Sequence, residues 1–176
     1  KQSKCLIQNA LLKAANGVRG FNMEKLELKK LVNKIIKKSF PILKEKEINL
    51  YYSKIKYQFS GGAYWILPFL RVLFINRKRN FTVKELKGLI AHELCHFEIY
   101  EKRGWILTII NGIWYYLSPK FRRKEEDLAE KLAIQKGYAR ETYVLTLKVQ
   151  KIKKNISKYY ATANEIKSYA KKIGKW

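Results

Sequence analysis

The chain has 176 residues, of which 38 are Lys or Arg and 14 are Asp or Glu, so its formal net charge at pH 7 is +24. This length suits one compact domain with a buried core, and this charge favours polyanions or anionic membrane surfaces as partners. With only two cysteines, Cys5 and Cys95, we expect neither a disulfide-stapled fold nor a disulfide-linked partner. We expect a cytoplasmic protein, with peripheral membrane association as the alternative. The abundance of Lys and Glu is also typical of thermophiles.

The N-terminal half of the chain predicts one helix and several strands. Residues 1–22 precede the only methionine, Met23, and we expect them to be a loosely attached segment. Apolar residues recur at helical spacing over 23–39, which predicts an amphipathic helix. Residues 48–57 are rich in Ile and Tyr and predict a strand, Gly61 and Gly62 predict a turn, and residues 63–67 and 71–75 predict two further strands.

Two uncharged, aromatic-rich runs cover residues 57–70 and 104–119. Both are shorter than the roughly 20 residues that a membrane-spanning helix needs. We expect them to form buried core or the wall of a cleft, with interfacial membrane contact through Trp and Tyr as the alternative.

Two helices in the second half have clear start signals. Thr82 and Glu85 have the spacing of a capping box, which predicts a helix that runs to residue 102 or 103, here called the motif helix. Ser118 followed by Pro119 predicts a second helix that ends near residue 137. Apolar residues at helical spacing predict a further helix over 144–156.

The motif helix carries both histidines of the chain, His92 and His96, with Glu93 directly after the first. Positions i and i+4 of a helix share one face, so the two imidazoles would point the same way. This HExxH pattern is typical of zinc hydrolases, in which the two histidines bind the metal and the glutamate is the general base.

A catalytic zinc ion normally takes three protein ligands, and no third histidine exists in this chain. We therefore expect a carboxylate from the acidic cluster on the helix over 118–137. Glu126 lies over the small residues Ala129 and Ala133, which would let this helix approach the motif helix closely, where Gly88 offers matching room. Glu125 lies within the apolar stripe of the same helix and is the alternative, as a ligand or as a neighbour that orients one. The pattern favours Glu126.

Residues 92–96 and 126–133 together resemble the gluzincin metallopeptidases, especially the minigluzincins and the HtpX-like family, over about residues 45–140. In those families an HExxH helix is followed by a helix of the form E-x-x-A-D-x-x-A. The resemblance implies Zn²⁺ held by His92, His96 and Glu126, with Glu130 in place of the family's Asp as a hydrogen-bond partner of a ligand histidine. It also implies an α+β fold, in which a small three- or four-stranded mixed sheet packs on the HExxH helix beside a Glu-ligand helix and additional N- and C-terminal helices. An edge strand of that sheet would bind the peptide substrate in extended form.

We therefore expect a zinc metallopeptidase that hydrolyses a peptide or protein substrate with a zinc-bound water and Glu93 as general base and acid. Tyr138 and Tyr143 are candidates for stabilising the oxyanion. The catalytic domain would cover residues 23–143, and residues 144–176 would form a basic helical extension. Either terminal segment is a candidate cover for the cleft of a latent protease, or zymogen.

The alternative function is that of a basic nucleic-acid-associated or regulatory protein that uses the same scaffold with little or no proteolysis. The charge of +24 suggests it, together with aromatic residues that alternate with lysines over 51–59 and 159–176.

Overall fold

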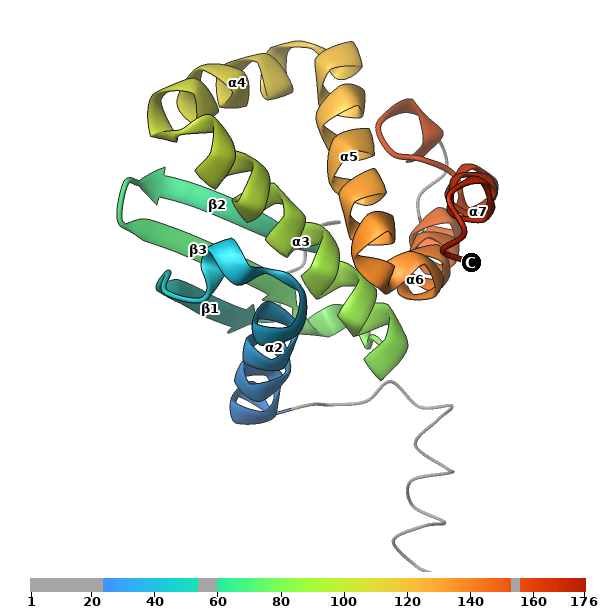
Figure 1. The fold of residues 1–176 in the computed structure, drawn as a ribbon, viewed down its shortest axis with the longest axis horizontal. Helices are drawn as coiled ribbons and strands as arrows, with labels where there is room; N and C mark the ends of the chain where they lie inside the picture. The colour runs from blue at the N-terminus through green and yellow to red at the C-terminus, as the bar shows by residue number, and fades with distance from the viewer. Residues whose placement is uncertain (1–23, 54–59, 153–155) are drawn as a thin grey trace, which may run out of the picture.

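The computed structural model describes residues 24–53, 60–152 and 156–176. Its fold is α+β, as predicted, with a small mixed sheet and helices that pack around it (Figure 1). The strands are β1 (Ile48–Ser53), β2 (Gly61–Leu67) and β3 (Leu70–Asn76). The α-helices are α2 (Lys25–Ser39), α3 (Val83–Arg103), α4 (Trp105–Leu117), α5 (Pro119–Ala133), α6 (Ala139–Ile152) and α7 (Ala163–Lys172). The N-terminal segment 1–22 and residues 54–57 of the first predicted strand lie outside the described residues.

The sheet has the strand order β1-β3-β2, in which β1 is parallel and β2 antiparallel to the central strand β3. Gly61 and Gly62 begin β2 and pair with Ile75 and Phe74, so the turn predicted at these glycines is wrong. The reason is packing against α3, because a Cβ at Gly61 would lie 3.0 Å from the Phe74 carbonyl oxygen and 3.1 Å from Leu89 Cδ1. Glycine here lets an edge strand lie directly on the motif helix.

Helix α3 is the motif helix, and it begins and ends where the sequence predicts. The Thr82 hydroxyl accepts a hydrogen bond from the Glu85 backbone N–H at 3.2 Å, and the Glu85 carboxylate accepts one from the Thr82 N–H at 2.7 Å. The helix ends before Gly104, whose φ of 86° suits glycine. In Figure 1 it runs through the middle of the molecule, with the sheet on one side and α5 and α6 on the other. Its histidines are therefore buried.

Helix α4 corresponds to the second apolar run, and the prediction of buried core is wrong for it. Within the described part of the chain, none of its residues is buried. One side of the helix does form the wall of a pocket, through Thr108, Asn111, Gly112 and Tyr115, as the cleft-wall prediction expected. No helix among the described residues is both long enough and apolar enough to cross a membrane.

Helix α5 begins at Pro119, with the Ser118 hydroxyl accepting a hydrogen bond from the Phe121 N–H at 3.2 Å. It passes into α6 through a π-helical turn, Ile134–Tyr138, in which Gly137 has a φ of 91°. The regular helix therefore ends at Ala133, a few residues before the predicted end. This change of direction brings α6, like α5, against α3.

Gly88 on α3 has a different partner from the one that the sequence suggested. A Cβ at this position would lie 2.4 Å from the carbonyl oxygen of Glu141, so its small size accommodates α6 and not α5. Helix α6 runs without a break across residue 143, and Leu145 belongs to the same core as the sheet and α3. The boundary expected at residue 143 therefore coincides with no break in the structure.

Candidate metal centre

Three buried side chains converge from two helices: His92 and His96 on α3 and Glu126 on α5. The Nε2 atoms of the two histidines are 3.2 Å apart. Glu126 Oε2 lies 3.1 Å from His92 Nε2 and 3.6 Å from His96 Nε2. The structure thus brings together the two histidines and the glutamate that the sequence favours, and this group could hold a metal ion.

The triangle of donor atoms fits a four-coordinate ion of the size of zinc. Bonds of about 2.0–2.1 Å in a tetrahedron separate neighbouring ligand atoms by about 3.3 Å, and the three distances in this site bracket that value. Two neutral imidazoles and one carboxylate are ligands that first-row divalent metals accept. The donor atoms, their spacing and their burial are all compatible with a metal-binding protein.

The electrostatics of the triad follow from the close contact between Glu126 and the histidines. Burial disfavours the charged form of His92, but the hydrogen bond to Glu126 and the negative charge of that carboxylate outweigh it and raise the pKa of His92 to about 9. Burial likewise favours the neutral form of Glu126, but hydrogen bonds to His92 and His96 hold the pKa of its carboxyl well below its usual range. A proton on His92 therefore competes with a metal ion for the same nitrogen.

Tyr115 on α4 holds the second oxygen of the Glu126 carboxylate. Its hydroxyl donates a hydrogen bond to Glu126 Oε1, while Oε2 faces the histidines. Burial and the nearby Glu126 charge raise the pKa of Tyr115, so its hydroxyl keeps its proton. Sequence reasoning missed this residue. The signal was present in the polar or small residues of α4 at helical spacing, namely Thr108, Asn111, Gly112 and Tyr115.

Glu93 is buried on α3 beside the triad and contacts the edge of the sheet. Burial raises the pKa of Glu93, an effect that the charges of His92 and His96 and a backbone hydrogen bond from Ala63 of β2 partly offset. Burial of this kind favours the protonated form of the carboxyl group and so helps it to take up a proton.

A pocket of about 400 Å³ surrounds these groups. Its walls come from β2, α3, α4, α5, α6 and the segment before α7, with Tyr64, Tyr100 and Tyr116 among its aromatic residues. A cavity of this size accommodates a small ligand or a few side chains of a peptide.

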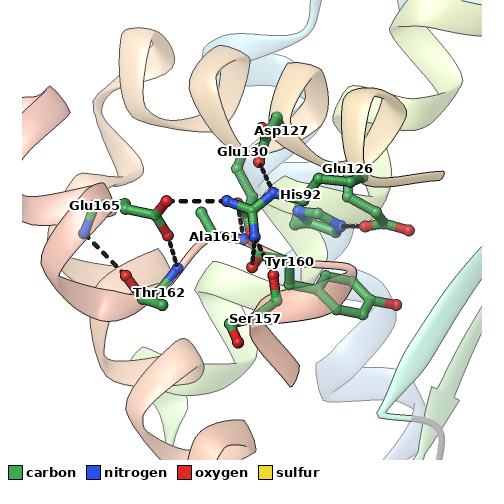
Figure 2. A network of polar contacts seen from close by, with 10 residues as sticks. His92, Glu126, Asp127, Glu130, Ser157, Tyr160, Ala161, Thr162 and Glu165 are labelled. Carbon is green, nitrogen blue, oxygen red and sulfur yellow. Dashed lines mark hydrogen bonds and ion pairs between the residues drawn. The ribbon is translucent and has the colours of Figure 1, made fainter. Parts of the chain in front are cut away.

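Glu125 and Glu130 both line the pocket. Neither forms the hydrogen bond to a triad residue that the sequence analysis considered for it. Glu125 forms two hydrogen bonds with the Arg103 guanidinium, at 2.8 and 2.9 Å, so Arg103 holds both of its oxygens. Glu130 accepts a hydrogen bond from the Ala161 N–H at 3.1 Å (Figure 2). Burial raises the pKa of Glu130 to about 7. The hydrogen bond to Ala161 joins α5 to the segment before α7, whereas the resemblance implied a hydrogen bond to a histidine of the triad.

The two tyrosines considered for oxyanion stabilisation lie elsewhere. The Tyr138 hydroxyl is 3.0 Å from the Ser39 hydroxyl, and the Tyr143 ring packs edge-on against Trp176. Neither is among the described residues that line the pocket. The described tyrosines that do line the pocket are Tyr64, Tyr100, Tyr115, Tyr116 and Tyr160, the last of which Figure 2 shows.

The segment before α7 is fixed to α5 by two arginines, Arg122 and Arg123. Figure 2 shows Asp127, Ser157, Tyr160 and Glu165, the partners of Arg123. Arg123 donates hydrogen bonds to the carbonyl oxygens of Ser157, at 2.6 Å, and Tyr160. The same guanidinium pairs with Asp127 at 2.9 Å and with Glu165 at 3.1 Å. Arg122 donates to the Tyr160 hydroxyl at 3.0 Å. The C-terminal part of the chain thereby supplies one wall of the pocket.

No family model matches this chain, and a comparison with curated proteins likewise finds no match. The functional argument therefore rests on the residues and their geometry.

Proposed function

We propose that this protein is a zinc-dependent peptidase of the gluzincin type. The observation that carries the proposal is the triangle of His92, His96 and Glu126 donor atoms at zinc spacing, with Glu93 buried next to it. Two histidines and a carboxylate leave a position open in a tetrahedral site, as catalytic zinc sites do.

Glu93 is the general base and acid of the proposed reaction. A zinc ion bound at the triad would supply Lewis-acid activation of a water and of the scissile carbonyl. Glu93 accepts the proton of the attacking water and then delivers it to the leaving amine. Its raised pKa suits both tasks, because the group must hold the proton between the two steps. The position one residue after His92 keeps Glu93 beside the ion without making it part of the triad.

Strand β2 is the proposed binding edge for a substrate peptide. Among the described residues it pairs with β3 alone, so its other edge is available to an extended chain. Residues 61–65 of this strand line the pocket that contains the triad. The backbone hydrogen bond from Ala63 to Glu93 further links this edge to the proposed base. Main-chain pairing of this kind would give affinity with little dependence on the substrate sequence.

The test compares zinc content and casein hydrolysis in wild type, Glu93→Gln and Glu126→Ala, with the exposed Glu27→Ala as the control. Glu93→Gln should bind zinc as wild type does and lose about 10²–10⁴-fold in hydrolysis. Glu126→Ala should lose zinc and hydrolysis together, because a ligand has gone. Unchanged hydrolysis in Glu93→Gln would refute the mechanism, and a full complement of zinc in Glu126→Ala would refute the ligand set.

Contacts among the described residues weigh against the alternative of a nucleic-acid-associated protein. Two of the aromatic residues on which it depends are engaged within the chain: Arg122 lies over the Tyr160 ring at 5.6 Å, and Trp176 packs on Tyr143. Bases stack on aromatic rings that are free. The alternative therefore stays a prediction from net charge.

A further inference from the structure

Helix α4 has its polar residues on the side that faces the protein and large apolar residues on the side that faces solvent. A helix on the surface of a soluble domain has the reverse arrangement. The residues of α4 that line the pocket include all of its polar and small residues other than tyrosine; they are Thr108, Ile109, Asn111, Gly112, Tyr115 and Tyr116. The opposite side carries large apolar residues that are exposed to solvent. A surface helix normally buries its apolar side and exposes its polar side, so α4 requires an explanation.

We define the α4 apolar face by five residues that share one side of the helix: Ile106, Ile110, Ile113, Trp114 and Leu117. Leu117, Ile106 and Ile113 are 70%, 69% and 55% exposed. In Figure 1 the helix lies at the edge of the molecule, as a bridge between the end of α3 and the start of α5. A contiguous apolar surface of this kind marks an interaction site.

The dimensions of α4 favour a position along a membrane surface. Thirteen residues give a helix of about 20 Å, which is shorter than the roughly 30 Å of bilayer hydrocarbon. The helix has no charged residue, and its sequence places Trp and Tyr beside branched aliphatic residues. Aromatic residues of this kind are typical of the boundary between lipid headgroups and acyl chains.

The charges around α4 are complementary to anionic lipid. Three exposed lysines flank its two ends, Lys102 before it and Lys120 and Lys124 after it. The nearest carboxylates on α5, Glu125 and Glu126, are buried and bound to Arg103 and to the histidines. A second copy of the chain is a poorer occupant, because two molecules of charge +24 repel one another.

We propose that the α4 apolar face docks in the interfacial layer of an anionic membrane, with the flanking lysines against the lipid phosphates. The opposite side of this helix lines the pocket, so docking places the pocket directly beneath the membrane surface. This inference does not depend on the peptidase reaction, and its test does not measure hydrolysis.

The test measures binding of the full-length protein to phosphatidylcholine vesicles with and without about one-third phosphatidylglycerol. We expect binding to the anionic vesicles that weakens as salt rises. The triple variant Ile110→Gln/Ile113→Gln/Leu117→Gln should bind at least tenfold more weakly, because apolar contact is lost while every charge remains. The matched control replaces three exposed apolar residues on other helices, Leu26→Gln/Leu128→Gln/Ile152→Gln, and should bind as wild type does.

Trp114 provides a second readout that reports depth. Brominated lipid should quench the tryptophan fluorescence of vesicle-bound wild type, and Trp114→Phe should remove a large part of that quenching. Circular dichroism spectra of all variants should match the wild type, since none of these side chains is buried.

Three results would overturn the proposal. Wild type that does not bind anionic vesicles would do so, and so would equal binding of the α4 triple variant and its control, which would leave charge alone as the cause. The third is a dimer, seen by sedimentation, that the α4 triple variant dissociates while neither protein binds vesicles, because the face would then join two copies.

Discussion

Replacement of Tyr115 by Phe tests whether α4 orients Glu126, the proposed third metal ligand. The substitution removes a single hydroxyl, which donates a hydrogen bond to Glu126 Oε1. It leaves the aromatic ring in place, together with the Arg122 guanidinium that lies 4.9 Å from the ring centre. The carboxylate would then be free to rotate, with Oε2 no longer directed at the two histidines.

The expected loss follows from the chemistry of that hydrogen bond. A hydrogen bond to a charged group contributes about 1.5–3 kcal/mol, and about 1.4 kcal/mol corresponds to a tenfold change in affinity. Zinc affinity should therefore fall about 10- to 100-fold, a range that substitutions of groups supporting metal ligands typically give. The free energy of unfolding of the metal-free protein should change much less than that of the zinc-bound protein.

The assay is competition for zinc with a chromophoric chelator of known affinity at fixed pH. Tyr116→Phe is the matched control, because Tyr116 is the next residue and is largely exposed, while the hydrogen bond to Glu126 Oε1 comes from Tyr115. It should bind zinc within twofold of wild type. Equal affinity of wild type and Tyr115→Phe would refute the reasoning, since the Glu126 carboxylate would then hold its position without the hydroxyl.

Three further predictions concern pH and packing. Zinc affinity should rise about tenfold per pH unit between pH 7 and 9, because the pKa of His92 is raised to about 9 and its proton must leave before the metal binds; chelator competition that shows constant affinity over this range would contradict it. In metal-free protein the pKa of Glu130 is raised by burial from the ordinary 4.5 to about 7, so the free energy of unfolding falls as pH rises between these values. Glu130→Gln keeps the acceptor for the Ala161 N–H without the charge, so urea unfolding should show it gaining about 3 kcal/mol on wild type from pH 4 to pH 8; a pH-independent difference would argue against this. Gly88→Ala should cost about 1–3 kcal/mol or more in urea unfolding, because the new Cβ lies 2.4 Å from a carbonyl oxygen of α6. Gly112→Ala, with nothing within 4 Å of its Cβ, is the control and should be neutral or stabilising by up to about 1 kcal/mol.

The features that sequence predicted well are those set by local chemistry. The capping box at Thr82 and the Ser118 cap satisfy backbone donors within three residues, so their sequence spacing is sufficient evidence. Helical spacing alone puts His92 and His96 on one face. The preference for Glu126 over Glu125 used the small residues at positions 129 and 133, and the structure brings Glu126 to the histidines while Glu125 binds Arg103.

The features that sequence did not predict depend on contacts between distant segments. Gly88 indicated close packing of a neighbouring helix but not which one. Helix α6 packs there because the chain changes direction at Gly137. Tyr160 reaches the pocket because Arg123 binds carbonyl groups 34 and 37 positions later in the chain. The exposure of α4 was not the favoured prediction for another reason. A rule that places apolar residues in the core fails for a helix that contacts the rest of the protein on one side only.

The part of the pocket wall at Tyr160 is synthesised after the other residues of the site. His92, His96 and Glu126 are all synthesised before Tyr160, which follows Glu126 by 34 positions. At about 5–20 residues per second, this separation amounts to roughly 2–7 s of translation. The contacts of Arg123 with the carbonyl groups of Ser157 and Tyr160 are therefore among the last in this site whose two partners have both been synthesised.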